Sequence, residues 1–115
     1  MPHIILEHSK AIESNVEIPA LIAKLHENLA AHGEIPVVRI KARAISISTH
    51  IVADKGANGT MAHLTLLLLE GRDTQTRQKY GTALYELLKQ EILPHYPECS
   101  ITLEVREMDK DTYYL

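Results

Sequence analysis

Pro2 has the most distinctive chemistry in this chain, because it stands directly after the initiator methionine. If Met1 is removed, Pro2 becomes a free secondary amine, whereas an interior proline is a tertiary amide without a basic lone pair. An α-amino group titrates at roughly 7.7 to 8.0, and burial or nearby cations bring that pKa toward neutrality. Pro2 could then exchange a proton at physiological pH. Many chains begin Met-Pro without such a role, so these two residues alone do not establish it.

A second chemical feature is a set of cations at every other position, Arg39, Lys41 and Arg43. In a regular strand these side chains share one face. Ile45 and Ile47 continue with the same parity, so this face changes from cationic to apolar along its length. Such a change is expected where a strand leaves a wet pocket and enters an interface. A solvated edge that carries Lys and Arg to discourage aggregation explains the pattern equally well.

The composition limits the partners of the chain. Its 115 residues are 45% apolar, include neither Trp nor Phe and carry a formal charge of -3. This length predicts one small domain. We expect neither nucleic acid nor an anionic membrane as a partner, because those call for stacking side chains or a basic chain. Any anion bound by this protein must therefore meet a local cationic patch.

Cysteine and histidine usage favours a cytoplasmic protein without disulfides or a metal site. Cys99 is the only cysteine, which excludes an intrachain disulfide and suits a reducing compartment. The seven histidines show none of the short spacings of a zinc site, so we expect no metal. Charged residues interrupt the N-terminal apolar run and no segment is long enough to span a bilayer, so we expect neither a signal peptide nor a membrane span.

Hydrophobic periodicity predicts the elements that position these residues. Strands are expected at 3–8, 37–48, 60–69 and 100–107. Helices are expected from near Pro19 to His32, with Gly33 as the stop, and from a cap at Asp73 or Thr74 to a stop before Pro94. Asn58-Gly59 is the strongest turn signal, and we place it in the linker between two halves.

The order of elements predicts an α+β fold in one domain over residues 1–115. Each half, about 2–48 and 60–106, is strand-helix-strand, and a right-handed crossover makes the two strands of a half parallel. The result is a four-stranded sheet with two helices on one face. The leucine run of the third strand requires cover on both faces. Because the chain has no second helix layer, we expect neighbouring subunits on the other face, hence an oligomer.

With these features in place, the chain resembles the tautomerase superfamily, and within it the 5-carboxymethyl-2-hydroxymuconate Δ-isomerase family. The resemblance runs over nearly the whole chain. It depends on the order and spacing of several short segments, at 2–7, 29–33, 40–43, 63–66, 71–72, 77–78 and 84–89.

The resemblance implies a homotrimer, a mixed sheet in which the first strands of the two halves pair antiparallel at its centre, and no cofactor. Pro2 would be the general base, and Lys41, Arg43 and Arg72 would bind the carboxylates and the developing oxyanion of a dienol dicarboxylate. One departure is that Arg is expected where this chain has Lys41. Lysine offers a point charge in place of a two-pronged donor, so carboxylate binding there would be looser.

The proposed chemistry is also consistent with the residues themselves. A doubly charged substrate accounts for cations in an acidic protein, and those cations favour the neutral, proton-accepting amine. The rival interpretation is a non-catalytic oligomeric ligand-binding or assembly module. In that case Arg39, Lys41 and Arg43 form a solvated edge, and a retained Met1 leaves Pro2 as an amide.

Overall fold

The computed structural model describes residues 1–115 and contains one mixed four-stranded sheet. Its strands are β1 (His3–Ser9), β2 (Lys41–Ile47), β3 (Met61–Leu69) and β4 (Ser100–Met108), in the spatial order β2-β1-β3-β4. β1 is parallel to β2, β3 is parallel to β4, and β1 and β3 pair antiparallel at the centre. The predicted sheet and its two strand-helix-strand halves are confirmed.

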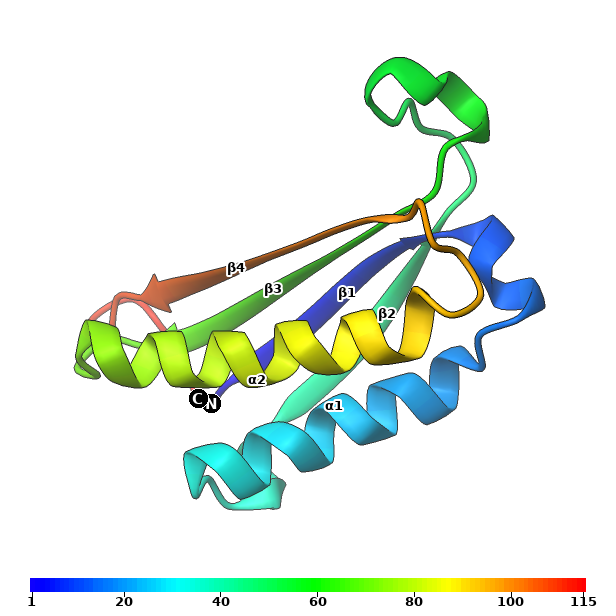
Figure 1. Ribbon diagram of the computed structural model, residues 1–115. Helices are drawn as coiled ribbons and strands as arrows, with labels where there is room; N and C mark the ends of the chain where they lie inside the picture. The colour runs from blue at the N-terminus through cyan, green and yellow to red at the C-terminus, as the bar shows by residue number, and fades with distance from the viewer.

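Two helices, α1 (Ile18–Gly33) and α2 (Thr74–Ile92), cover the same face of the sheet (Figure 1). Strand alternation explains why: even-numbered residues such as Ile4, Leu6, Leu64 and Leu66 are fully buried beneath the helices. Facing leucines on α1 and α2 complete this core. None of the helices is long and apolar enough to cross a membrane.

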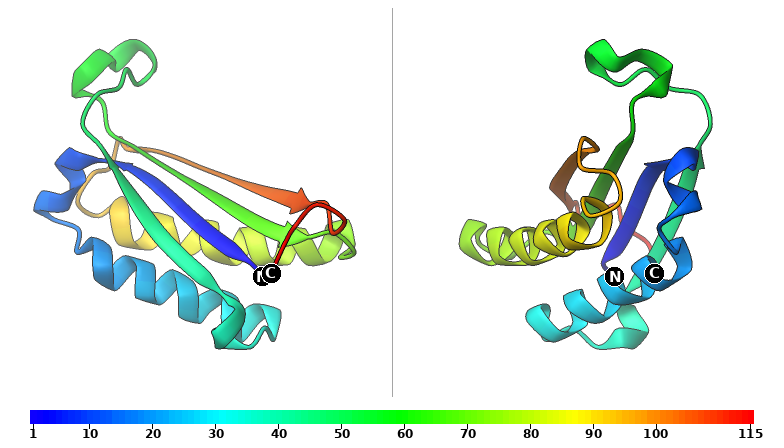
Figure 2. Two further views of the ribbon diagram at one scale, coloured as in Figure 1. Left: turned by 180° about the vertical axis from the view of Figure 1, so that it is seen from behind. Right: turned by 45° about the vertical axis from the view of Figure 1, so that its right-hand side comes forward.

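The opposite face of the sheet has no cover within this chain (Figure 2). Odd-numbered side chains lie there, including Ile5, Leu67 and Ile45, and Ile45 is 48% exposed. As predicted, the single chain has no second layer on this face.

The start of the second strand and the end of the first helix differ from the sequence prediction. The second strand begins at Lys41 and not at Val37, because Val37–Arg39 form a 3-10 turn in which the Arg39 N–H donates to the Pro36 carbonyl at 2.9 Å. Arg39 therefore does not continue the strand face of Lys41 and Arg43. α1 includes Gly33, and Glu34 takes the left-handed cap position instead, with φ at 52°.

The linker between the halves is longer than a tight Asn-Gly turn. A 3-10 segment, Ala53–Asn58, projects from the body of the molecule (Figure 1), and β2 and β3 are separated in the sheet by β1. The left-handed glycine is Gly56, with φ at 64°. Gly59 is extended instead, and a Cβ there would lie 2.7 Å from the Val52 Cβ. Close packing, not a hairpin, explains this glycine.

The packing predicts a large effect for a leucine under the helices. Leu64→Ala removes a fully buried side chain and should lower the free energy of unfolding by about 2–5 kcal/mol. Val38→Ala is the control, because Val38 is 82% exposed and should change stability by under about 0.5 kcal/mol. Chemical denaturation of both variants measures this, and equal stabilities would contradict the described core.

Candidate active site

Pro2 is buried at the start of β1, where hydrogen bonds hold the backbone on both sides. Its carbonyl accepts the Lys41 N–H at 3.0 Å, which begins the β1–β2 ladder. The Met1 amine donates to the Arg39 carbonyl at 2.5 Å. The N-terminus is thus part of the sheet and lies at a fixed place, as expected for a strand that begins at His3.

A cavity of about 200 Å³ opens beside Pro2. Three connections converge on it: the turn after α1, the 3-10 turn at Arg39, and the loop between β3 and α2. Its lining residues are Met1, Pro2, Gly33, Glu34, Ile35, Pro36, Arg39, Leu69 and Arg72.

Two of the predicted site residues meet in this cavity, Pro2 and Arg72. Lys41 is the next neighbour through its backbone bond to Pro2, and its charge acts on the terminal amine. Arg43 does not line the cavity. It lies on the uncovered face of the sheet, and its guanidinium donates to His3 Nδ1 at 3.0 Å.

None of the four cations near the N-terminus, Arg39, Lys41, Arg43 and Arg72, has a carboxylate partner within 4.0 Å. The ion pairs of the chain involve other residues: His8, Lys24, Lys55, Arg77, Lys89 and Arg106. This is notable in a chain with 15 acidic and 12 basic residues. Unpaired cations around a concave site favour binding of an anion.

These cations also act on the terminal amine. The pKa of the Met1 amine is lowered, first by burial and then by the charges of Lys41, Arg39 and Arg72. Both causes disfavour a further positive charge. An amine at this end of β1 is therefore shifted toward its neutral form, which is the form that accepts a proton.

Arg72 is oriented by the elements around it. It follows Gly71, whose φ of 125° is accessible to glycine but strained for other residues, and its guanidinium lies 5.9 Å from the centre of the Tyr80 ring. The Tyr80 hydroxyl donates to the Gly33 carbonyl at 3.3 Å. α2 and the end of α1 therefore fix the wall against which Arg72 lies.

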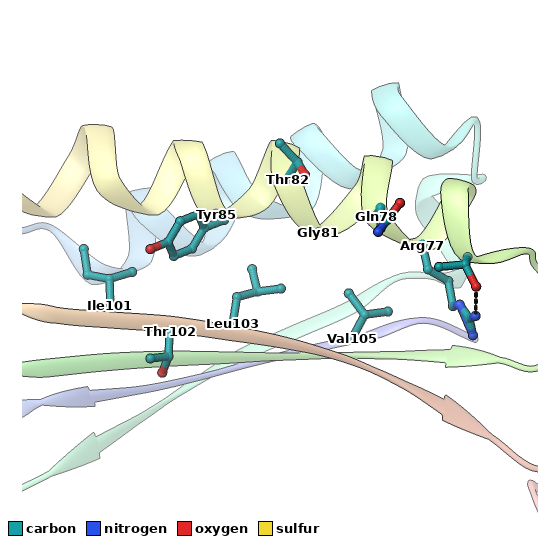
Figure 3. Close-up of a pocket in the computed structure, with 10 residues that line it drawn as sticks. Arg77, Gln78, Gly81, Thr82, Tyr85, Ile101, Thr102, Leu103 and Val105 are labelled. Atoms are coloured by element: carbon teal, nitrogen blue, oxygen red, sulfur yellow. Dashed lines mark hydrogen bonds between the residues drawn. The ribbon is translucent and has the colours of Figure 1, made fainter.

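A larger cavity, of about 740 Å³, lies elsewhere, between α2 and the edge strand β4 (Figure 3). Its lining is aliphatic, hydroxyl and amide, and Arg77 is its only charged side chain. Arg77 is neutralised by Glu107 at 2.7 Å and also donates to the Thr74 hydroxyl at 2.9 Å. This groove offers no acid–base group comparable to the terminal amine, so we do not place the chemistry there.

Sequence reasoning missed two parts of the site. The sequence places Arg39 on a strand face or a solvated edge, but the 3-10 turn directs it into the cavity. The sequence also gives no sign that residues 33–36, beyond the helix stop at Gly33, line a site. Pro36, three residues before Arg39, has no backbone N–H to donate to a strand ladder and is the available signal of a turn before the strand.

Comparison with known proteins identifies the family of the chain. Residues 2–114 match the family model described as 5-carboxymethyl-2-hydroxymuconate isomerase. The chain is 37% identical over 89 residues to 5-carboxymethyl-2-hydroxymuconate Delta-isomerase of Escherichia coli, which covers 77% of this chain and 71% of the relative.

Solved structures show the same fold. A 5-carboxymethyl-2-hydroxymuconate isomerase from Deinococcus radiodurans R1 superposes with a TM-score of 0.83 at 28% identity, covering 99% of this chain and 87% of that one. A fused 4-OT wild type symmetric trimer is similar in fold, with a TM-score of 0.71 at 16% identity, covering 98% of this chain and 90% of that one. The chain belongs to the 5-carboxymethyl-2-hydroxymuconate isomerase family and has the tautomerase fold.

Proposed function

We propose that this isomerase uses the amine of Pro2, freed by removal of Met1, as its general base. The observation that carries the proposal is the position of the N-terminus: backbone hydrogen bonds hold it beside a cavity lined by Arg39 and Arg72, with Lys41 as its neighbour. The lowered pKa of the Met1 amine supports it, because the same burial and cations would act on a Pro2 amine, and a base must be neutral to accept a proton.

The substrate that fits is a hydroxymuconate-type dienol with two carboxylates. Pro2 removes the proton of the enol hydroxyl, and the electron pair of that O–H bond forms the C=O bond. The conjugated double bonds shift, and the proton held on the amine is delivered to a carbon, giving the keto isomer. The reaction is redox-neutral and needs no cofactor.

The cations would bind the carboxylates of the substrate and stabilise the negative charge that develops during the reaction. Arg72 and Arg39 line the cavity and would hold a carboxylate or stabilise the oxyanion as it develops. Lys41 and Arg43 lie on β2 and would bind the second carboxylate, Lys41 more loosely than an arginine. A carboxymethyl group, as in the name of the relatives' substrate, would add a third negative charge.

We also propose a homotrimer that works in the cytoplasm. The uncovered sheet face, with Ile5, Ile45 and Leu67, and the free edge of β4 are surfaces that a second copy can cover. The similar fused 4-OT structure is described as a symmetric trimer, which supports this number of subunits. The buried free thiol of Cys99 suits a reducing compartment.

Pro2→Ala should lose most of the rate. The change keeps a terminal amine but removes the secondary amine and its ring, and general base catalysis is worth about 100- to 10,000-fold. Ketonisation of a dienol dicarboxylate is followed by ultraviolet absorbance, using protein whose intact mass shows that Met1 is absent. Equal rates for wild type and variant would favour the non-catalytic module, and so would a wild type that binds dicarboxylates without converting them.

Arg72→Ala should weaken binding and turnover together. Hydrogen bonds to charged groups contribute about 1.5–3 kcal/mol, which corresponds to roughly 10- to 150-fold in kcat/KM. Lys10→Ala is the matched control, because Lys10 is exposed, forms no ion pair and lies outside the cavity. If both variants keep wild-type kcat/KM, Arg72 does not contact the substrate.

A further inference from the structure

His3, the residue after Pro2, joins three parts of the molecule through its ring. Its Nδ1 lies 3.0 Å from the Arg43 guanidinium on β2, and its Nε2 lies 2.7 Å from the hydroxyl of Tyr113 in the C-terminal segment. The Tyr113 ring meets the imidazole edge to face, with 5.9 Å between ring centres and 74° between planes. Both ring nitrogens are therefore occupied.

The donor and acceptor roles follow from the chemistry of the partners. A guanidinium has only donors, so Nδ1 must offer its lone pair to Arg43. The ring is then neutral, its one proton lies on Nε2, and that N–H donates to the Tyr113 oxygen. The environment of His3 also favours the neutral ring. The pKa of His3 is lowered, first by burial and then by the charges of Arg43, the N-terminal amine and Lys41.

No carboxylate lies within 4.0 Å of the His3 ring nitrogens, and this includes Asp109, Asp111 and the C-terminal carboxylate in the segment that carries Tyr113. β2 presents Arg43 and Lys41, β3 presents Leu67 as the cross-strand partner, and the C-terminal segment presents the hydroxyl of Tyr113. A protonated ring would lose its bond with Arg43 and add a positive charge one residue from Pro2. The neutral ring is therefore the form that this site accommodates.

The C-terminal segment, residues 109–115, spans the gap between two parts of the proposed site. Near its beginning, the Lys110 N–H donates to the Glu70 carboxylate at 2.8 Å, two residues before Arg72. Near its end, Tyr113 meets His3, one residue after Pro2. The two termini accordingly lie side by side in all views (Figure 2).

We propose that His3 and Tyr113 are positioning residues: Tyr113 and Arg43 hold His3 as its neutral Nε2–H tautomer, and the C-terminal segment thereby fixes the Pro2 amine relative to Arg72. This inference rests on the proposed function for its catalytic consequence. The proposal also makes a structural claim, that Tyr113 sets the tautomer of His3. This claim can be tested without measuring activity.

The test compares Tyr113→Phe with Tyr114→Phe, because Tyr114 is 88% exposed and its hydroxyl forms no hydrogen bond. Nitrogen-15 NMR of the His3 ring in wild type at pH 7 should show an unprotonated Nδ1 and a protonated Nε2. Tyr113→Phe should lower kcat/KM by about 2- to 10-fold, as expected for one lost hydrogen bond, and should shift the His3 Nε2 resonance. Tyr114→Phe should change neither.

Two further variants separate positioning from general stability. In a His3→Ala background, Tyr113→Phe should have no additional effect, because the partner through which it acts is gone. His3→Gln keeps an N–H donor and cannot become charged, so it should retain more kcat/KM than His3→Ala and lack the loss of rate that protonation of His3 causes at low pH.

A charged or Nδ1–H ring at pH 7 would overturn the proposal, as would a Tyr113→Phe variant that matches Tyr114→Phe in both readouts, or additive effects of His3→Ala and Tyr113→Phe. Failure of the proposed function is recognised separately, by wild-type rates for Pro2→Ala. In that case the NMR result alone decides whether Tyr113 controls the tautomer of His3.

Discussion

The candidate site depends on the parallel pairing of β1 with β2. The ladder begins with the bond from the Lys41 N–H to the Pro2 carbonyl, and it continues with His3 beside Lys41. This pairing turns the N-terminus, which would otherwise fray, into a fixed position among cations. The lowered pKa of the terminal amine follows from this position, since burial and nearby positive charges both penalise its protonated form.

The same sheet imposes an asymmetry on the molecule. Its even-numbered face is sealed by α1 and α2, whereas its odd-numbered face carries His3, Arg43 and several aliphatic side chains without a covering layer. Four cations without a carboxylate partner, Arg39, Lys41, Arg43 and Arg72, cluster near the end of the sheet where β1 begins. The buried core thus lies on the helix side, and the exposed face is free to contact other molecules.

Much of this architecture was predictable because it depends on local chemistry. The cap of α2 is an example: the Asp73 side chain accepts the Thr76 N–H at 2.8 Å, a contact that spans three residues. The parity of Lys41 and Arg43 was also correct. The start of β2 was wrong, because strand periodicity does not reveal that residues 37–39 close a 3-10 turn. The contact of His3 with Tyr113 joins residues 110 positions apart, beyond any local pattern.

Titration of the N-terminal amine by nitrogen-15 NMR tests the central claim most directly. The sample is protein whose intact mass shows that Met1 is gone, with Pro2 labelled. We predict a pKa below the ordinary range of roughly 7.7 to 8.0, because burial and the charges of Lys41, Arg39 and Arg72, which lower the pKa of the Met1 amine, should act in the same way on the Pro2 amine next to it. Activity should then rise with pH as this amine loses its proton. A pKa at or above the ordinary range would contradict the account.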